Sequence, residues 1–188
     1  MKPPATLLVT LLLLGSCMIT PATGLAREAA NSATETRIKA AFLFKFCHYV
    51  TWPDSAFPAS DSPINIGVIG SDDIARELQQ AVAGRSIQQR PLHVRTYTAA
   101  TLPDDIQLLY VGAAARAAAP RWLASLQGKP VLVVTDSRNG LDRGSSINFE
   151  VDGDRVRFDI SLSAAQAHQL KLSSQLLSVA RQVRGTPP

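Results

Sequence analysis

Apolar and polar residues alternate along the chain in stretches whose spacing predicts helices and strands. Apolar side chains recur at helical spacing over residues 35–50, with Thr34 as the expected N-cap. Trp52-Pro53 ends this predicted helix, because the residue before a proline is pushed out of the helical region. Short runs rich in β-branched residues predict four strands, at 64–70, 92–98, 106–111 and 131–135.

Two further helices are expected between these strands. Gly70-Ser71-Asp72-Asp73 is suited to capping a helix that carries its apolar residues at Ile74, Leu78, Ala81 and Val82. Pro120 fits the first turn of a second helix that reaches Leu126. The strands and helices therefore follow one another as in an α/β protein.

The last third of the chain predicts a β-hairpin and then two helices. Residues 147–151 and 155–160 alternate in character on either side of Asp152-Gly153, a favoured pair for a tight turn. Serines provide the caps of both helices, Ser161 or Ser163 for a helix through His168 and Ser173 or Ser174 for a helix to Val183. We therefore expect a single-domain α/β sandwich, with a mixed sheet flanked by helices and a C-terminal hairpin followed by two helices.

The N-terminus has the pattern of an export signal. A positive start precedes an apolar stretch at 7–14, and small residues end at Ala26, so residues 1–26 are expected to be a secretory signal peptide. The alternative is a lipoprotein signal, 1–16, because Leu14-Gly15-Ser16-Cys17 resembles a lipobox that would make Cys17 the lipidated residue. Either route leads to the periplasm, in the second case tethered to a membrane. The remaining segments are a linker at 27–34, the domain at 35–184 and a tail at 185–188.

Composition and charge narrow the class of protein. With 46% hydrophobic and 18% charged residues, the chain is expected to form a packed core. The net charge of +4 comes from residues scattered along the chain, and no basic stripe is present. Nucleic acid is therefore not an expected partner.

Removal of the leader would leave Cys47 as the only thiol in an oxidising compartment, so no intramolecular disulfide is expected. The simplest interpretation of Cys47 is a small buried hydrophobe. The alternative is a free thiol with a redox role or a role in bridging a homodimer.

A search for chemistry in the sequence yields no strong motif, and we expect no enzyme activity, metal or cofactor. Gly-x-Ser-x-Gly is absent, and the three histidines are isolated from other metal-ligating residues. Gly70 and Ser71 are weak candidates for an anion site at a strand-to-helix junction, although an ordinary capped turn is favoured. The segment 136–146 is either a recognition loop or a connection. Paired carboxylates for acid–base chemistry would have to come from residues such as Asp136, Asp142, Asp152 and Asp159, and the sequence does not show which of them lie close together.

Three motifs in this order and spacing resemble the YfiR family of periplasmic regulators, over residues 35–184. The first is Ile38-Lys39-Ala40-Ala41-Phe42-Leu43 with Phe46 and Trp52-Pro53, and the second is Ile66-Gly67-Val68-Ile69-Gly70. The third lies in the C-terminal part of the domain and comprises Gly144, Ile147-Asn148-Phe149, Arg155-Val156-Arg157-Phe158-Asp159-Ile160, Leu172-Ser173-Ser174-Gln175-Leu176-Leu177 and Ala180.

This resemblance implies a periplasmic repressor that binds the periplasmic sensory domain of a membrane-bound diguanylate cyclase and so controls cyclic di-GMP and biofilm formation. It also implies an outer-membrane lipoprotein partner that sequesters the repressor. The best-known members carry cysteine pairs in the mature domain, but residues 136–149 contain no cysteine here, so disulfide-based control is not expected. The alternative function is a periplasmic small-ligand-binding sensor or transport accessory protein.

Overall fold

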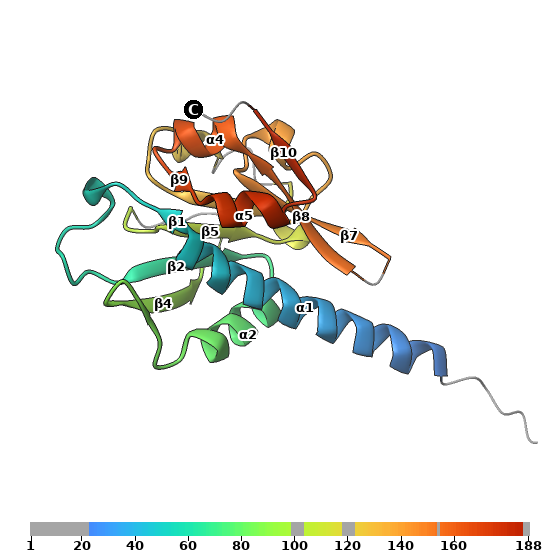
Figure 1. The fold of residues 1–188 in the computed structure, drawn as a ribbon. Helices are drawn as coiled ribbons and strands as arrows, with labels where there is room; N and C mark the ends of the chain where they lie inside the picture. Colours follow the sequence, from blue (N-terminus) through green and yellow to red (C-terminus); the bar gives the residue numbers. More distant parts are fainter. Residues whose placement is uncertain (1–22, 99–103, 118–122, 154, 186–188) are drawn as a thin grey trace, which may run out of the picture.

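The computed structural model describes residues 23–98, 104–117, 123–153 and 155–185 (Figure 1). Its α-helices are α1 (Thr23–Tyr49), α2 (Asp72–Val82), α4 (Leu162–Ala167) and α5 (Ser174–Val179). Its strands are β1 (Val50–Thr51), β2 (Ile64–Ile69), β3 (Ser86–Ile87), β4 (Arg90–Thr96), β5 (Leu108–Val111), β6 (Leu132–Thr135), β7 (Ile147–Asp152), β8 (Arg155–Ser161), β9 (Lys171–Leu172) and β10 (Gln182–Arg184). Short 3₁₀ turns form at Asp54–Ala56, Ala113–Ala115 and Leu141–Arg143.

Eight of these strands form one mixed sheet in the order β10-β8-β7-β6-β5-β2-β4-β3. The central strands β4, β2, β5, β6 and β7 run parallel, whereas β7 and β8 form the antiparallel hairpin that the sequence predicts. Strand β2 pairs with β4 on one side and with β5, which comes later in the chain, on the other side. The direction of winding thus reverses at β2, and ligand crevices in such sheets form at this point. The predicted α/β sandwich is confirmed.

The core lies on both faces of the sheet. On the face covered by α1, α2 and α5, aromatic side chains pack together, with ring centroids 5.0 Å apart for Phe46 and Phe158 and 5.8 Å apart for Phe46 and Phe149. On the opposite face, Leu123 and Leu126 cover Leu109 and Val133 in a smaller cluster. Each fully buried side chain of this size contributes about 1.5–3 kcal/mol of transfer free energy.

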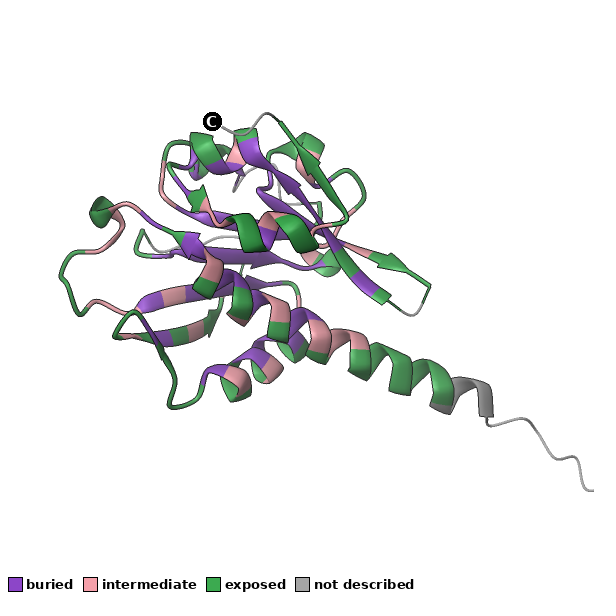
Figure 2. Cartoon of the chain, viewed as in Figure 1, coloured by how far each residue is buried: buried purple, intermediate pink, exposed green. Residues whose placement is uncertain are grey.

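Helix α1 begins much earlier than the sequence analysis predicts. It starts at Thr23 rather than after Thr34, and the hydroxyl of Thr34 donates to the carbonyl of Ala30 within the helix. The segment 27–34, expected to be a linker, is therefore helical, and all of its residues are exposed (Figure 2). Alanine and glutamate favour helix even without a buried face, and this helix already has a nucleus in its packed half.

The C-terminal helix is shorter than predicted, and the chain ends in a strand. Helix α5 stops at Val179, and β10 pairs in parallel with β8 through Val183 and Ile160. The prediction of helix to Val183 is wrong, because Arg181 is held by the buried carboxylate of Asp159 and the chain gains a strand partner there. The capping serines Ser161 and Ser173 are as predicted.

Other differences concern short strands and boundaries. Strand β3 turns directly into β4 through Gln88 and Gln89, which both have positive φ although neither is a glycine. The paired strands β1 and β9 were not expected either. Strand β4 starts at Arg90 rather than residue 92 and ends at Thr96 rather than residue 98, and β5 starts two residues later than predicted. Pro120, the expected start of a helix, lies outside the described residues, whereas residues 123–125 are helical.

Within the described ranges, none of the helices combines the length and apolar character needed to cross a membrane.

Candidate functional site

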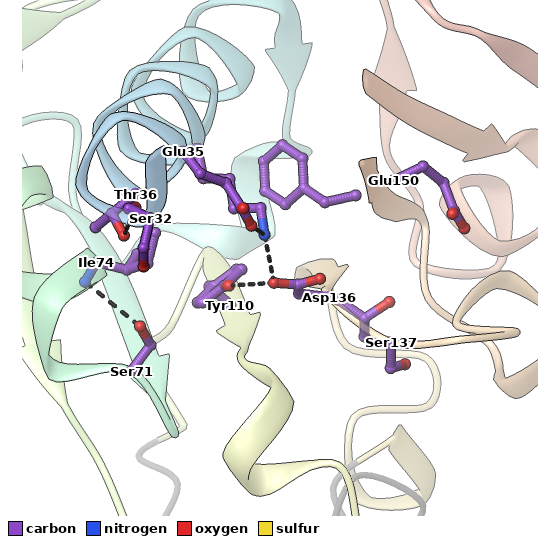
Figure 3. Close-up of polar contacts among 12 residues, drawn as sticks. Ser32, Glu35, Thr36, Ser71, Ile74, Tyr110, Asp136, Ser137 and Glu150 are labelled. Atoms are coloured by element: carbon purple, nitrogen blue, oxygen red, sulfur yellow. Dashed lines mark hydrogen bonds and ion pairs between the residues drawn. The ribbon is translucent and has the colours of Figure 1, made fainter. Parts of the chain in front are cut away.

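Polar side chains gather beneath α1 at the carboxyl ends of the central parallel strands (Figure 3). Tyr110 lies in β5, and Asp136 and Ser137 follow directly after β6. Ser71 follows β2 and is drawn at the border of the same region. Because carboxyl ends of parallel strands share one edge of the sheet, residues far apart in sequence meet here. This edge is the candidate functional site.

Helix α1 contributes a lysine from its buried face. Lys39 falls at helical spacing with Leu43, Phe46 and Val50, and all four side chains are buried. Glu35 lies one turn earlier on the same side of the helix. Only 4% of the surface of Lys39 is exposed, so its ammonium group requires partners inside the protein.

These partners are two carboxylates, and one of the carboxylates also accepts a hydrogen bond from a tyrosine. The Nζ of Lys39 donates to Oδ2 of Asp136 at 2.6 Å and also to Oε1 of Glu35. The hydroxyl of Tyr110 donates to the same Oδ2 at a longer 3.4 Å. We call these four residues the Lys39 cluster. It joins α1 to strands β5 and β6 across the top of the sheet.

Burial and pairing act in opposite directions on the Lys39 ammonium. Burial alone would lower the pKa of Lys39, but its hydrogen bonds with Asp136 and Glu35 outweigh burial, so the pKa is raised. The pKa of Tyr110 is also raised, first by burial and then by the negative charge of Asp136. At neutral pH the cluster therefore contains a charged lysine and a neutral phenol, and these groups satisfy one another.

A second polar network supports the segment that follows β6. The side chain of Asn148 is buried, and its Oδ1 accepts from the Thr135 hydroxyl at 2.7 Å and from the backbone N–H of Ser137 at 3.3 Å. The Nδ2 of Asn148 donates to Glu150 at 2.9 Å. The Thr135 and Ser145 hydroxyls lie 2.9 Å apart. We call this set the Asn148 network; it fixes both ends of segment 136–146.

Gly140 packs directly onto this network. A Cβ added at Gly140 would lie 2.2 Å from Oδ1 of Asn148 and 2.2 Å from Oγ1 of Thr135. No side chain fits there, although the backbone of Gly140 has an ordinary helical φ of −55°. Segment 136–146 is therefore held close to the sheet by buried polar contacts, and it positions Asp136 for Lys39.

The weak anion candidates Gly70 and Ser71 take the form of a capped turn. The Ser71 hydroxyl accepts from the backbone N–H of Ile74 at 3.4 Å, as an N-cap does. Gly70 has a φ of +71°, and a Cβ there would lie 2.6 Å from that of Ala115. Within the part of the chain that the structure describes, no hydrogen bond joins either residue to the Lys39 cluster, so an anion role for them stays a prediction.

The structure describes one of the two cysteines, Cys47. Cys47 is in the core with 1% of its surface exposed, and burial raises the pKa of its thiol to about 12. Cys17, the residue that a lipoprotein route would modify, lies outside the described residues.

The candidate metal ligands and carboxylates remain dispersed. His48 and His93 are exposed, and the buried ring of His168 hydrogen-bonds to the carbonyl of Lys129 at 2.8 Å through Nδ1. Among the described residues, no group of three or more His, Cys, Asp or Glu side chains is placed to hold a metal ion. The described ion pairs place three of the four carboxylates with separate cations: Asp136 with Lys39, Asp142 with Arg184 and Asp159 with Arg181.

Sequence reasoning overlooked Lys39, Glu35 and Tyr110. A signal for Lys39 is present in the sequence, because it interrupts the apolar stripe that continues through Leu43 and Phe46. A lysine on the buried face of a helix predicts a carboxylate partner. The sequence could not identify Asp136 as that partner, because 97 positions separate the two residues.

The chain is similar to known proteins at the level of family and fold. The family model described as YfiR/HmsC-like matches residues 36–181, which include the Asn148 network and every member of the Lys39 cluster except Glu35. No curated protein matches the chain significantly.

Among solved structures, one similar chain is a conserved domain protein from Vibrio cholerae O1 biovar El Tor strain N16961, with 12% identity and a TM-score of 0.50. The match covers 64% of this chain and 54% of that one. Another is the ABC domain in complex with L-Trp from Streptococcus pneumonia, with 12% identity, a TM-score of 0.47 and coverage of 64% and 55%. The chain thus spans about half the length of these solved structures.

Proposed function

The chain belongs to the YfiR/HmsC-like family, and from this membership we propose that it represses a membrane-bound diguanylate cyclase by binding its periplasmic sensory domain. Membership in this family implies a periplasmic regulator of cyclic di-GMP signalling. The observation that carries the proposal is the extent of the family match, which runs over residues 36–181 and so includes every strand of the eight-stranded sheet except β10.

The candidate site supports a role in binding rather than in catalysis. The ammonium of Lys39 and the phenol of Tyr110 both donate a hydrogen bond to Asp136, and the side chains of Lys39 and Tyr110 are buried. Groups that satisfy one another in this way position an element and are not poised to react. We therefore propose that the Lys39 cluster holds α1 in a fixed orientation, so that the protein presents a rigid surface to its partner, and that the protein is not an enzyme.

The direct test is to delete the gene in its own bacterium and measure cyclic di-GMP by mass spectrometry. Loss of a repressor should raise cyclic di-GMP and increase biofilm formation, and the intact gene supplied in trans should restore the original level. An unchanged level under several envelope stresses would count against repression. Overproducing the outer-membrane lipoprotein that relieves repression should give the same rise as the deletion.

Export and lipidation need a separate experiment, because they depend on the first residues of the chain. Residues 1–26 fused to alkaline phosphatase should make the enzyme active, since this enzyme folds only in an oxidising compartment. Labelled palmitate distinguishes the two export routes: incorporation that disappears in Cys17→Ala would support the lipoprotein route, and no incorporation would support the soluble one.

A further inference from the structure

Strand β4 lies beside β2 near one edge of the sheet (Figure 1), and the short strand β3 covers its outer edge only in part. Strand β3 pairs with the first two residues of β4, Arg90 and Pro91. On the inner edge, β2 pairs with β4 from Leu92 to Thr96. The outer edge of residues 92–96 thus has no strand partner among the described residues. Such an edge can accept an additional extended chain.

The direction of the backbone groups along β4 follows from one hydrogen bond. The N–H of Tyr97 donates inward to the carbonyl of Val68 at 2.9 Å. Because successive residues of a strand alternate, the backbone groups of Leu92, Val94 and Thr96 point outward. The Val94 carbonyl accepts from Nε2 of Gln79 at 3.4 Å, a long bond that a backbone N–H of another chain can replace.

A groove of about 690 Å³ runs along this edge, between the end of α2 and β4. A second hollow of about 430 Å³ adjoins it beside the end of α1, and the two share Arg85 and Ser86. The described residues that line them include three cations and two histidines and no carboxylate: Lys45, Arg85, Arg95, His48 and His93.

The arginines at this edge differ from those at the opposite edge of the sheet. Beside β10, Arg181 and Arg184 are paired with Asp159 and Asp142. No ion pair within the described part of the chain involves Arg85 or Arg95. The guanidinium of Arg85 instead lies over the ring of Phe44, 5.2 Å from its centroid. The positive charge at the β4 edge is therefore not neutralised by the described residues.

We propose that the outer edge of β4 and its groove dock an extended acidic segment of a protein partner, which adds to the sheet as a further strand. The side chains of β4 define the pattern of that segment. His93 and Arg95 are exposed on one face of the strand, whereas Leu92 is buried on the other and Val94 is partly buried. A paired strand repeats this alternation, so the segment should alternate acidic with apolar residues. This inference deepens the proposed function by assigning a surface and a partner chemistry to it.

The purified chain and a short blocked peptide that alternates Glu with Val provide the test. The peptide should bind, and its affinity should fall as added salt screens the charges. Hydrogen exchange at the backbone amides of Val94 and Thr96 should become slower when the peptide is bound. A matched peptide that alternates Lys with Val should not bind. Replacing a central Val of the acidic peptide by Pro should also weaken binding, because proline cannot donate to the strand.

Two arginine variants test the surface itself. Arg85→Ala and Arg95→Ala should each weaken binding about fivefold, the effect of losing one solvated ion pair. The matched control is Arg157→Ala on β8, an exposed arginine away from the groove, which should bind like the unchanged chain. Both groove arginines are exposed, so these variants should keep the fold, and circular dichroism checks this.

Three outcomes would overturn the inference: no binding of the acidic peptide, equal binding of the lysine peptide, or unchanged affinity in both groove variants. Binding to vesicles containing phosphatidylglycerol in place of the peptide would also overturn it, since the surface would then recognise a membrane. The peptide test uses only the purified chain, so its failure would not contradict the proposed repression of a diguanylate cyclase. An unchanged cyclic di-GMP level after gene deletion would contradict repression but would not contradict peptide binding at β4.

Discussion

Replacing Lys39 by methionine tests whether the Lys39 cluster holds α1 on the sheet. Methionine keeps most of the apolar stem but removes the ammonium, so Asp136 and Glu35 lose their shared cation. The side chain of Lys39 is 5% exposed, whereas those of Asp136 and Glu35 are 26% and 37% exposed. The lysine is therefore buried, but its two partners retain part of their hydration.

The size of the effect follows from these exposures. Breaking a fully buried ion pair costs about 3–5 kcal/mol, because one charge is left without a partner. Exposed pairs contribute only about 0.2–1 kcal/mol. With a buried cation and partly hydrated anions, we expect Lys39→Met to lower the free energy of unfolding by about 2–3 kcal/mol. In a domain of this size this corresponds to a fall in Tm of roughly 5–10 °C.

Urea unfolding followed by circular dichroism measures this change, provided that the m-value stays constant. The single variants Lys39→Met and Asp136→Asn and the double variant form a thermodynamic cycle, and we expect a coupling energy above about 1 kcal/mol. Lys45→Met is the matched control, because Lys45 lies on the same helix but is exposed. That control should change stability by less than about 0.5 kcal/mol.

A loss below about 0.5 kcal/mol together with no coupling to Asp136 would refute the reasoning. Under that result the buried face of α1 would be held by its apolar side chains alone, and the cluster would have no anchoring role.

Three further predictions concern two glycines, the Cys47 thiol and the pH dependence of stability. Gly140→Ala should destabilise the chain by about 2 kcal/mol or more in urea unfolding, since its Cβ would meet Asn148, whereas Gly84→Ala has open space and should cost only about 1 kcal/mol for its positive φ. Cys47 should react with a thiol reagent such as DTNB only after unfolding, because its thiol is buried and its pKa is raised to about 12; rapid labelling of the folded chain would contradict this. The raised pKa of Lys39 predicts stability that is complete below the ordinary lysine pKa of 10.5 and is lost as pH rises through the higher folded-state pKa. Unfolding midpoints measured at increasing alkaline pH should therefore fall more steeply for the unchanged chain than for Lys39→Met.

The sequence by itself determined the elements whose signals are local. The cap at Ser71, the turn at Asp152-Gly153 and the end of α1 before Pro53 all depend on residues two to four positions apart. The buried runs of β2 and β6 are also readable, because a central strand is covered on both faces and becomes apolar throughout. These signals were enough to predict the α/β class and the hairpin.

Only the tertiary structure decided which distant residues meet. Strand β10 forms because β8 offers a free edge and Asp159 a buried charge for Arg181, and the local sequence around residue 182 favours helix as readily. Lys39 and Asp136 become partners because helix packing and the parallel order of β5 and β6 bring their separate elements to one edge of the sheet. Such contacts depend on the topology of the whole sheet, which short-range spacing along the chain does not encode.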